Sequence, residues 1–190
     1  LKLDDAKFKA VREAYLKHVE KMLSMAGVNN AQQAAASIMA LETEIAKIQW
    51  SNVENRNPVK TYNKVEIAKL SDFLSGFDWN KYFVEMGTGG KTDTVIVRQP
   101  SYLTGLNKVI QDTPLETWQA YFNWRVLNAY APYLSKRFVD QDFSFSNVTL
   151  RGIPENQPRW KRGVGRVEES LSEALGQLYV EKHFPAENKA

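Results

Sequence analysis

Cysteine is absent from this chain of 190 residues, and histidine occurs only at positions 18 and 183. The absence of thiols excludes a disulfide framework and a thiolate-ligated metal site. A zinc site of the H-E-x-x-H type is excluded as well, because neither His18 nor His183 has the glutamate and the second histidine that this motif requires. We therefore expect both histidines to be ordinary surface or helix-end residues.

Long apolar runs are also missing. No stretch approaches the roughly eighteen residues of a membrane-spanning helix, and no signal-peptide pattern is present. Lys and Arg outnumber Asp and Glu by only 25 to 22. Because the two signs are interspersed, this balance favours a solvated surface without a nucleic-acid partner. The chain begins at Leu1 and not at Met, so we expect an excised segment of a longer protein.

Helical patterning dominates what is present. Apolar residues recur every three or four positions over most of the sequence, which predicts a mainly α fold of long antiparallel helices with at most one or two short strands. The first helix is expected to begin at Asp4 or Asp5 and to end at Gly27, and the second to begin at Asn29 or Asn30. Their predicted inward residues are Phe8, Val11, Tyr15, Val19, Met22 and Leu23, then Ala34, Ile38, Leu41, Ile45 and Ile48.

The pattern is weaker in the segment that follows. Residues 51–63 are polar and contain a proline, which indicates an ordered loop or a linker. A helix is expected after Asn63, because Asn63 and Glu66 have capping-box spacing, and another over residues 79–86. Residues 94–97 (TVIV) form the only β-branched run. We expect one short strand there, paired with a second short segment or with polypeptide outside this sequence.

Proline marks the helices of the next segment. Pro100 suits the first turn of one helix, and Thr113-Pro114 has the residue types of a helix cap followed by a first helical position. The apolar residues of 115–134 go nearly all round the predicted helix, which indicates burial on several sides, and Pro132 should end or kink it.

The last long stretch, residues 159–184, has the clearest single apolar stripe. It predicts one central helix about 40 Å long, and we expect Trp160 to be a core residue beside a solvated basic face. The stripe consists of Trp160, Val164, Val167, Leu171, Leu175 and Leu178.

Several motifs invite a chemical interpretation, and each has a simpler one. Residues 87–92 (GTGGKT) end like a phosphate-binding loop, but the first glycine of that motif is missing and a strand follows, so we expect a flexible turn. Residues 147–149 (NVT) form a glycosylation sequon, which matters only in a eukaryotic secretory context. No nucleophile elbow of a hydrolase is present. A basic cluster is expected to be a solvated face and not a nucleic-acid contact; it consists of Arg159, Lys161, Arg162 and Arg166.

Several short segments spread along the whole chain are similar to the signature sequences of one protein family. Residues 56–64 (RNPVKTYNK) are similar to the family's R-[ND]-P-x-x-x-Y-N-K signature, and residues 97–106 to its V-x-x-P-x-Y-L-x-x-L segment. The W-R pair at 124–125 is similar to one on a long helix of the family. Residues 158–162 (PRWKR) and 173–181 (EALGQLYVE) resemble R-W-x-R and a-[VL]-G-x-L-Y-V-E. On these segments the chain resembles the neprilysin-like zinc metallopeptidases. The absence of cysteine is closer to bacterial members than to the disulfide-rich animal ones.

The resemblance implies that residues 1–190 are a single helical lobe of a larger zinc endopeptidase, inactive alone because the catalytic domain lies outside this sequence. It implies no catalytic, cofactor-binding or metal-binding residue here, since the zinc that activates water belongs to that domain. The lobe is expected to enclose the substrate cavity and to restrict access to small peptides, with the catalytic domain of the same polypeptide as its partner. Family members are usually secreted, membrane-anchored or lipoprotein ectoenzymes, which implies an extracytoplasmic parent.

Asn128-Ala129-Tyr130 is similar to part of the family's N-A-[FY]-[YF] segment, which holds the substrate backbone. Ala131 replaces its second aromatic residue, and the run is expected on the same helix as Trp124, so we assign it no substrate binding. The alternative to a peptidase lobe is a stand-alone helical module that binds a partner protein in an apolar groove. An H-E-x-x-H motif downstream in the gene would favour the lobe, and a nearby stop codon the module.

Overall fold

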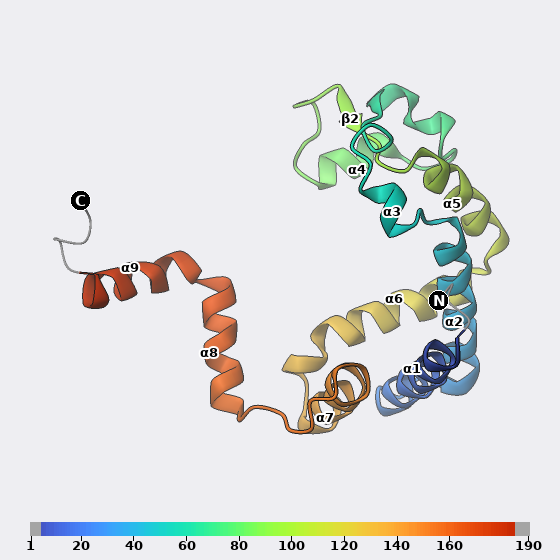
Figure 1. The fold of residues 1–190 in the computed structure, drawn as a ribbon. Helices are drawn as coiled ribbons and strands as arrows, with labels where there is room; N and C mark the ends of the chain where they lie inside the picture. The colour runs from blue at the N-terminus through green and yellow to red at the C-terminus, as the bar shows by residue number, and fades with distance from the viewer. Residues whose placement is uncertain (1–4, 185–190) are drawn as a thin grey trace. The chain divides into compact units, whose positions relative to one another are not determined.

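The computed structural model describes residues 5–184, and the chain divides into two compact units, Leu1–Leu150 and Arg151–Ala190. The fold is mainly helical, as predicted, and two short strands form the only sheet among the described residues (Figure 1). Within the same residues, no helix has the length and apolar character of a membrane span.

Two adjacent helices joined by a short turn open the first unit. The helix α1 (Ala6–Met25) begins at Asp5, whose side chain accepts a hydrogen bond from the Phe8 amide, and the chain turns at Gly27, which has a φ of +81°. The helix α2 (Ala31–Ile48) packs along α1. Asn30 stands at its predicted start but makes no side-chain capping bond. Its φ of 54° lies in the left-handed region, so Asn30 forms part of the turn between α1 and α2 and does not cap α2 with its side chain.

A small sheet follows the helical pair. The short helix α3 (Asn52–Asn55) is a single turn with a capping box between Ser51 and Glu54, which the prediction of an ordered loop or linker over residues 51–63 did not include. The strand β1 (Lys64–Glu66) pairs antiparallel with β2 (Thr94–Ile96). The predicted strand is confirmed, and it pairs with a short segment of the same chain.

Asn63 has a different role from the predicted cap. Its Nδ2 donates hydrogen bonds to the carbonyl oxygens of Lys60 (2.8 Å) and Val97 (3.0 Å), which hold the start of β1 beside β2. The chain becomes helical only after β1, in the 3-10 helix η1 (Ile67–Asp72). The capping-box prediction was wrong because residue spacing does not distinguish a local cap from a bond to a residue 34 positions away.

Two further helices complete the middle of the unit. The helix α4 (Trp79–Glu85) begins at Asp78, whose side chain accepts a hydrogen bond from the Lys81 amide. The helix α5 (Pro100–Asp112) has its proline in the first turn, as predicted. It packs against α2, and a Cβ added at Gly105 would stand 2.9 Å from Ile48 Cγ2. Glycine permits this close approach of the two helices.

The first unit ends with a run of helical segments. The helix α6 (Leu115–Tyr130) begins where predicted, but Pro114 is the residue before it and no side-chain cap forms. The 3-10 turn η2 (Ala131–Tyr133) then ends the helix, which confirms the effect predicted for Pro132. The helix α7 (Lys136–Phe143) and the π-helical turn η3 (Ser144–Thr149) follow.

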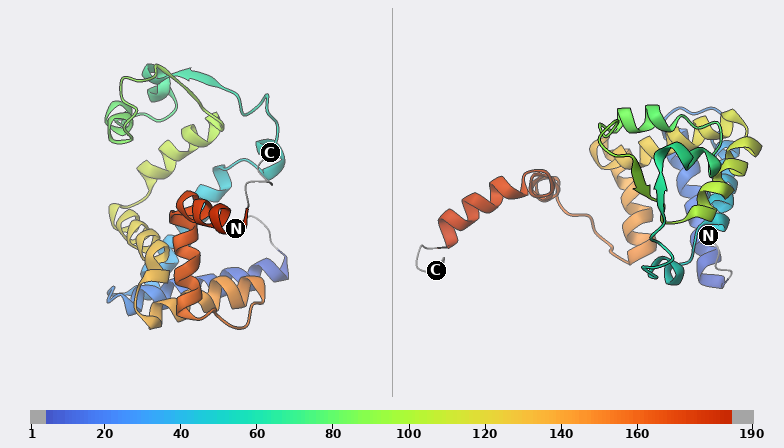
Figure 2. Two further views of the ribbon diagram at one scale, coloured as in Figure 1. Left: turned by 90° about the vertical axis from the view of Figure 1, so that its left-hand side faces the viewer. Right: turned by 90° about the horizontal axis from the view of Figure 1, so that it is seen from above.

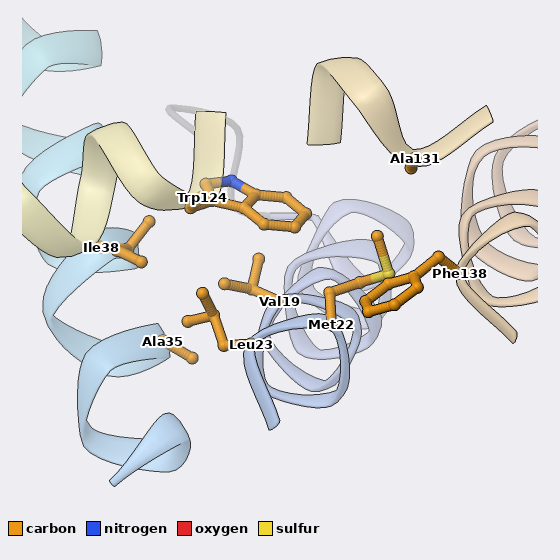
Figure 3. Packing of buried hydrophobic residues seen from close by; sticks show 8 residues of the cluster. All are labelled: Val19, Met22, Leu23, Ala35, Ile38, Trp124, Ala131 and Phe138. Carbon is orange, nitrogen blue, oxygen red and sulfur yellow. The ribbon is translucent and has the colours of Figure 1, made fainter. Parts of the chain in front are cut away.

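The core of the first unit lies between α1, α2, α6 and α7, and Figure 3 shows its side chains pointing toward one another. Trp124 is the largest fully buried side chain. The cluster consists of Val19, Met22, Leu23, Ala35, Ile38, Trp124, Ala131 and Phe138.

His18 also belongs to this interior, so the prediction of a surface residue is wrong. Only 2% of it is exposed. Its ring stacks on Phe145 with a centroid distance of 4.7 Å and meets Trp124 edge-on at 5.4 Å, and Gln141 Nε2 lies 3.2 Å from its Nδ1. Helical spacing explains the burial, because His18 lies four positions before Met22 and shares its side of α1.

The second unit contains two helices instead of the predicted continuous one. The helix α8 (Arg159–Ser170) and the helix α9 (Ser172–His183) run in different directions, as Figure 2 shows. The chain breaks at Leu171, which has φ −129° and ψ 34°. Serines flank this residue at 170 and 172, and serine favours helix ends over helix interiors. His183 lies in the last turn of α9, as predicted.

The predicted burial of Trp160 is also wrong, because 67% of it is exposed. The other five residues of the predicted stripe are likewise exposed; they are Val164, Val167, Leu171, Leu175 and Leu178. Periodicity correctly places apolar residues on one side of α8, but it does not say which surface covers them.

Candidate functional site: the outer face of α6

The helix α6 has one buried side and one exposed apolar side. Trp124 is 2% exposed and belongs to the core, whereas Phe122, Val126 and Tyr130 are each 59% exposed. Two residues correspond to about 200° around a helix, so Phe122 and Val126 both lie nearly opposite Trp124. The prediction of burial on several sides is therefore wrong. We call Leu115, Phe122, Val126 and Tyr130 the outer face of α6.

The buried side is held in place by hydrogen bonding as well as packing. Trp124 Nε1 donates a hydrogen bond of 3.0 Å to the hydroxyl of Tyr15 on α1. This hydrogen bond and the packing of Trp124 set the rotation of α6 about its axis, and that rotation determines which residues form the outer face.

Burial raises the pKa of Tyr15, and the neighbouring carboxylate of Glu42 raises it further. Burial also raises the pKa of Glu42 itself.

Aromatic rings surround the exposed side. Trp118 stacks on Phe122 with a centroid distance of 5.9 Å, and Tyr121 meets Phe122 edge-on at 5.5 Å. The guanidinium carbon of Arg125 lies 5.9 Å from the Tyr121 ring centroid. Such a surface offers apolar and aromatic contacts to another protein surface or to peptide side chains. Nothing in this arrangement pairs a nucleophile with a base.

The predicted motifs lie at separate places in the fold. Asn128-Ala129-Tyr130 is on the same helix as Trp124, as predicted. The glycine run is a turn before β2, as predicted, in which Lys91 Nζ donates to the Gly87 carbonyl. In the basic cluster, Arg162 donates to the Gln157 carbonyl, Arg166 pairs with Glu169, and Lys161 lies over the Trp160 ring.

The signature at residues 56–64 folds into an ordered loop. The side chain of Asn57 accepts hydrogen bonds from the amides of Val59 and Lys60, and the hydroxyl of Thr61 donates to the Asn57 carbonyl. Asn63 then joins this loop to Val97. The signature therefore shapes the start of the sheet.

Sequence reasoning missed the outer face, although a signal was present. Gln119 lies three positions before Phe122 and Asn123 one position after it. Both are exposed polar residues. A helix buried all round would not place two amides there. Their positions indicate which side of α6 faces away from the core.

The described residues do not offer a zinc site. Within residues 5–184 no group of three or more His, Asp or Glu side chains is placed to hold a metal ion. His18 is surrounded by Phe145, Trp124 and an amide of Gln141, which are not zinc ligands. No chemical step can therefore be assigned to a metal held by these residues.

Comparison with known proteins gives a consistent result. A family model described as peptidase family M13 matches residues 1–190. The chain is 30% identical to neprilysin-11 of Caenorhabditis elegans over 80% of its own length and 18% of the relative. It is 27% identical to human membrane metallo-endopeptidase-like 1 over 95% of its own length and 25% of that protein.

A bacterial enzyme of known structure is also similar. The zinc metalloprotease Zmp1 of Mycobacterium tuberculosis in its open state matches 97% of this chain and 29% of its own, with 34% identity and a TM-score of 0.89. The partial open state of the same enzyme matches 96% of this chain with a TM-score of 0.76. The chain thus spans less than a third of the length of each of these proteins.

Proposed function

Because the chain belongs to peptidase family M13, we propose that it is the non-catalytic helical lobe of a zinc metalloendopeptidase. In this proposal residues 1–190 form one lobe, although their contacts group into two units. Zinc and the hydrolytic groups belong to the catalytic domain of the same polypeptide, which is the partner of this lobe. The much greater length of the relatives supports this division, and the match over the whole chain makes a stand-alone interaction module the less favoured alternative.

The lobe encloses the substrate cavity and admits only small peptides. The observation that carries this role is the outer face of α6, where Phe122, Val126 and Tyr130 are more than half exposed although the opposite side of the helix is anchored in the core. Large apolar side chains exposed side by side mark a surface that meets a ligand or another protein surface. We assign the outer face to the wall of the cavity.

The parent enzyme acts outside the cytoplasm in this proposal. The resemblance to ectoenzymes of the family supports this location, and so does the similarity to a human relative whose name places that protein at a membrane. Residues 1–190 themselves contact neither nucleic acid nor a cofactor in the proposed role.

Zinc analysis and a peptide-cleavage assay test the division of labour. The purified 190-residue chain is expected to bind no stoichiometric zinc at neutral pH and to cleave no peptide, whereas the complete polypeptide does both. One tightly bound zinc ion per 190-residue chain, together with cleavage, would overturn the proposal.

A series of peptides with one cleavage site and increasing length tests the enclosure. We expect kcat/KM of the complete peptidase to fall steeply with peptide length, because a long chain does not fit a closed cavity. Phe122→Ala and Val126→Ala should soften this length dependence by removing bulk from the cavity wall. Val59→Ala, which is exposed elsewhere in the first unit, is the matched control. Equal rates at all lengths, or the same profile in all variants, would contradict the role of the outer face.

A further inference from the structure

A buried histidine joins the end of the first unit to α1. His18 contacts α7 through Gln141 and η3 through Phe145. The Phe145 ring also lies 5.6 Å from the ring of Tyr15, which stands three positions before His18 on the same side of α1. Phe145 is the only aromatic residue of η3 (SFSNVT). The ring contacts between η3 and α1 therefore depend on Tyr15 and His18.

The contact with Gln141 specifies the protonation of the imidazole. Gln141 Nε2 lies 3.2 Å from His18 Nδ1. An amide nitrogen only donates hydrogen bonds, so Nδ1 accepts one and the neutral ring carries its proton on Nε2. A proton on Nδ1 would set two donors against each other among aromatic rings, where a buried donor without an acceptor is costly. The site therefore fits neutral His18 and disfavours its protonated form.

The charged groups of the surrounding elements do not compensate a proton on His18. Burial is the cause that lowers the pKa of His18. Glu42 of α2 and Arg125 of α6 act on the Tyr15 hydroxyl, and the Asp142 carboxyl of α7 interacts with Ser146. The remaining charged residues of these helices are engaged with each other, lie over a ring or stand about two turns before Trp124; they are Glu44 with Lys47, Lys136 with Asp140, Arg137 over Phe138, and Glu116. On α1 itself, Lys17 and Lys21 are exposed and have the same sign as a protonated imidazole.

The turn η3 is suited to local release. A π-helical turn is rare and is often found at functional positions, and Val148, the other large apolar residue of η3, is 43% exposed. We propose that His18 is an acid-sensitive latch: the neutral ring holds η3 and the end of α7 against α1, and protonation of Nδ1 releases them while the rest of the core stays closed. Because η3 is the last element of the first unit, release frees the point from which the chain continues into Arg151–Ala190. The inference concerns this fold alone and does not rest on the proposed function.

Hydrogen exchange at pH 7 and pH 4.5, corrected for the intrinsic exchange rate at each pH, tests the latch in the complete polypeptide. The closed site lowers the pKa of His18 to about 4, whereas the released ring takes up its proton at the ordinary value of 6.5. Protection of the amides of residues 145–150 should therefore fall about fiftyfold between pH 7 and pH 4.5. These amides should also exchange faster than those of residues 35–41 in α2 at both pH values, because the middle of α2 is exposed only when the core opens.

Three variants assign the response to the ring. His18→Phe keeps an aromatic ring against Phe145 but takes up no proton, so the fall in protection should be lost. Gln141→Glu places a carboxylate beside Nδ1, which accepts a hydrogen bond from the protonated ring and should keep η3 closed in acid. His183→Gln removes the only other histidine of residues 1–190 and should leave the fall intact.

Two outcomes would overturn the latch. Equal protection of residues 145–150 and 35–41 at pH 4.5 would mean that His18 is exposed only when the whole core unfolds. An unchanged fall in His18→Phe would assign the acid response to another group. If His18→Phe does not fold, Gln141→Glu decides, because a fall as large as that of the parent chain would exclude a role for Nδ1. Asp142 does not imitate the latch, since burial raises its pKa and its protonation favours the closed segment as the pH falls.

Discussion

The indole Nε1 of Trp124 donates a hydrogen bond of 3.0 Å to the hydroxyl oxygen of Tyr15, and the two rings meet edge to face with centroids 6.1 Å apart. This contact joins α6 to α1 at the edge of the core. It holds the Trp124 side of α6 inward and leaves Phe122 on the opposite side. The candidate functional surface therefore depends on a pair of residues that do not belong to it.

Removal of the Tyr15 hydroxyl should destabilise the chain. Tyr15→Phe leaves the buried Trp124 Nε1 without its acceptor, and the free energy of unfolding should fall by about 1–3 kcal/mol. Urea denaturation followed by tryptophan fluorescence measures the change. Tyr62→Phe, at an exposed position, is the matched control and should stay within about 0.5 kcal/mol of the parent chain. Equal effects of the two variants would show that the hydrogen bond contributes little.

Protonation of His18 should weaken the fold in mild acid. Burial lowers the pKa of His18 from its ordinary value of 6.5 to about 4. Between these two values the unfolded chain binds a proton that the folded chain does not, so the contribution of His18 to stability is lost as the pH falls from about 6.5 to about 4. At about 1.4 kcal/mol for each pKa unit, this loss is at most about 3.5 kcal/mol.

The variant His18→Gln isolates this contribution. Burial raises the pKa of Glu42 and of Asp142, so these two carboxyl groups favour the folded chain more as the pH falls. Both groups are present in the parent chain and in the variant, so their effect cancels in the comparison. The difference in unfolding free energy between the parent chain and His18→Gln should therefore shrink between pH 7 and pH 4.5. Parallel curves of stability against pH would contradict the assignment.

Gly105→Ala should destabilise the contact between α5 and α2. A Cβ at this position would stand 2.9 Å from Ile48 Cγ2 and 3.1 Å from Ile48 Cβ, and overpacking of this kind typically costs about 1–3 kcal/mol. Gly165→Ala in α8 has nothing within 4 Å of the new Cβ, so it should gain about 0.5–1 kcal/mol in helix stability. Thermal unfolding followed by circular dichroism distinguishes the loss of stability in Gly105→Ala from the gain in Gly165→Ala. A stabilising Gly105→Ala would show that Ile48 moves aside at low cost.

Asn63 should prove necessary for the small sheet. Asn63→Ala and Asn63→Asp both remove the amide donor that bonds the carbonyl oxygens of Lys60 and Val97, at an expected cost of about 1–2 kcal/mol. Hydrogen exchange of the amides of residues 94–97 should become faster in both variants. Asn123→Ala, at an exposed position of α6, should leave this exchange unchanged. Unaltered protection in Asn63→Asp would show that the side-chain amide of Asn63 does not stabilise the sheet.

Ile38→Ala and Leu171→Ala should differ sharply in the 190-residue chain. Ile38 is fully buried in the core, and its truncation should cost about 2–5 kcal/mol. Leu171 is exposed at the break between α8 and α9, so its truncation should stay within about 0.5 kcal/mol. Periodicity alone predicts comparable costs for both. Chemical denaturation of the two variants measures these costs. An equal loss of stability in Leu171→Ala and Ile38→Ala would contradict the exposed position of Leu171.

Local signals predicted most of the helix positions correctly. Asp5 caps α1, Gly27 turns the chain after it, and Pro100 opens α5. Each of these effects depends on atoms within one helical turn, so residue type and spacing are sufficient to predict it. The same reasoning failed at Asn63, because the partner of its side chain is on a distant strand.

The amino-acid sequence by itself determined the mainly helical class, the family and the apolar sides of the helices, because these follow from residue order and short-range chemistry. Only the tertiary structure decided which of those sides are covered. It buried His18 and Trp124 and left Phe122 and Trp160 exposed, although all four lie in helical patterns rich in apolar residues. The physical reason is that a repeating pattern specifies an angle around a helix, whereas burial requires a second surface, whose position depends on the rest of the chain.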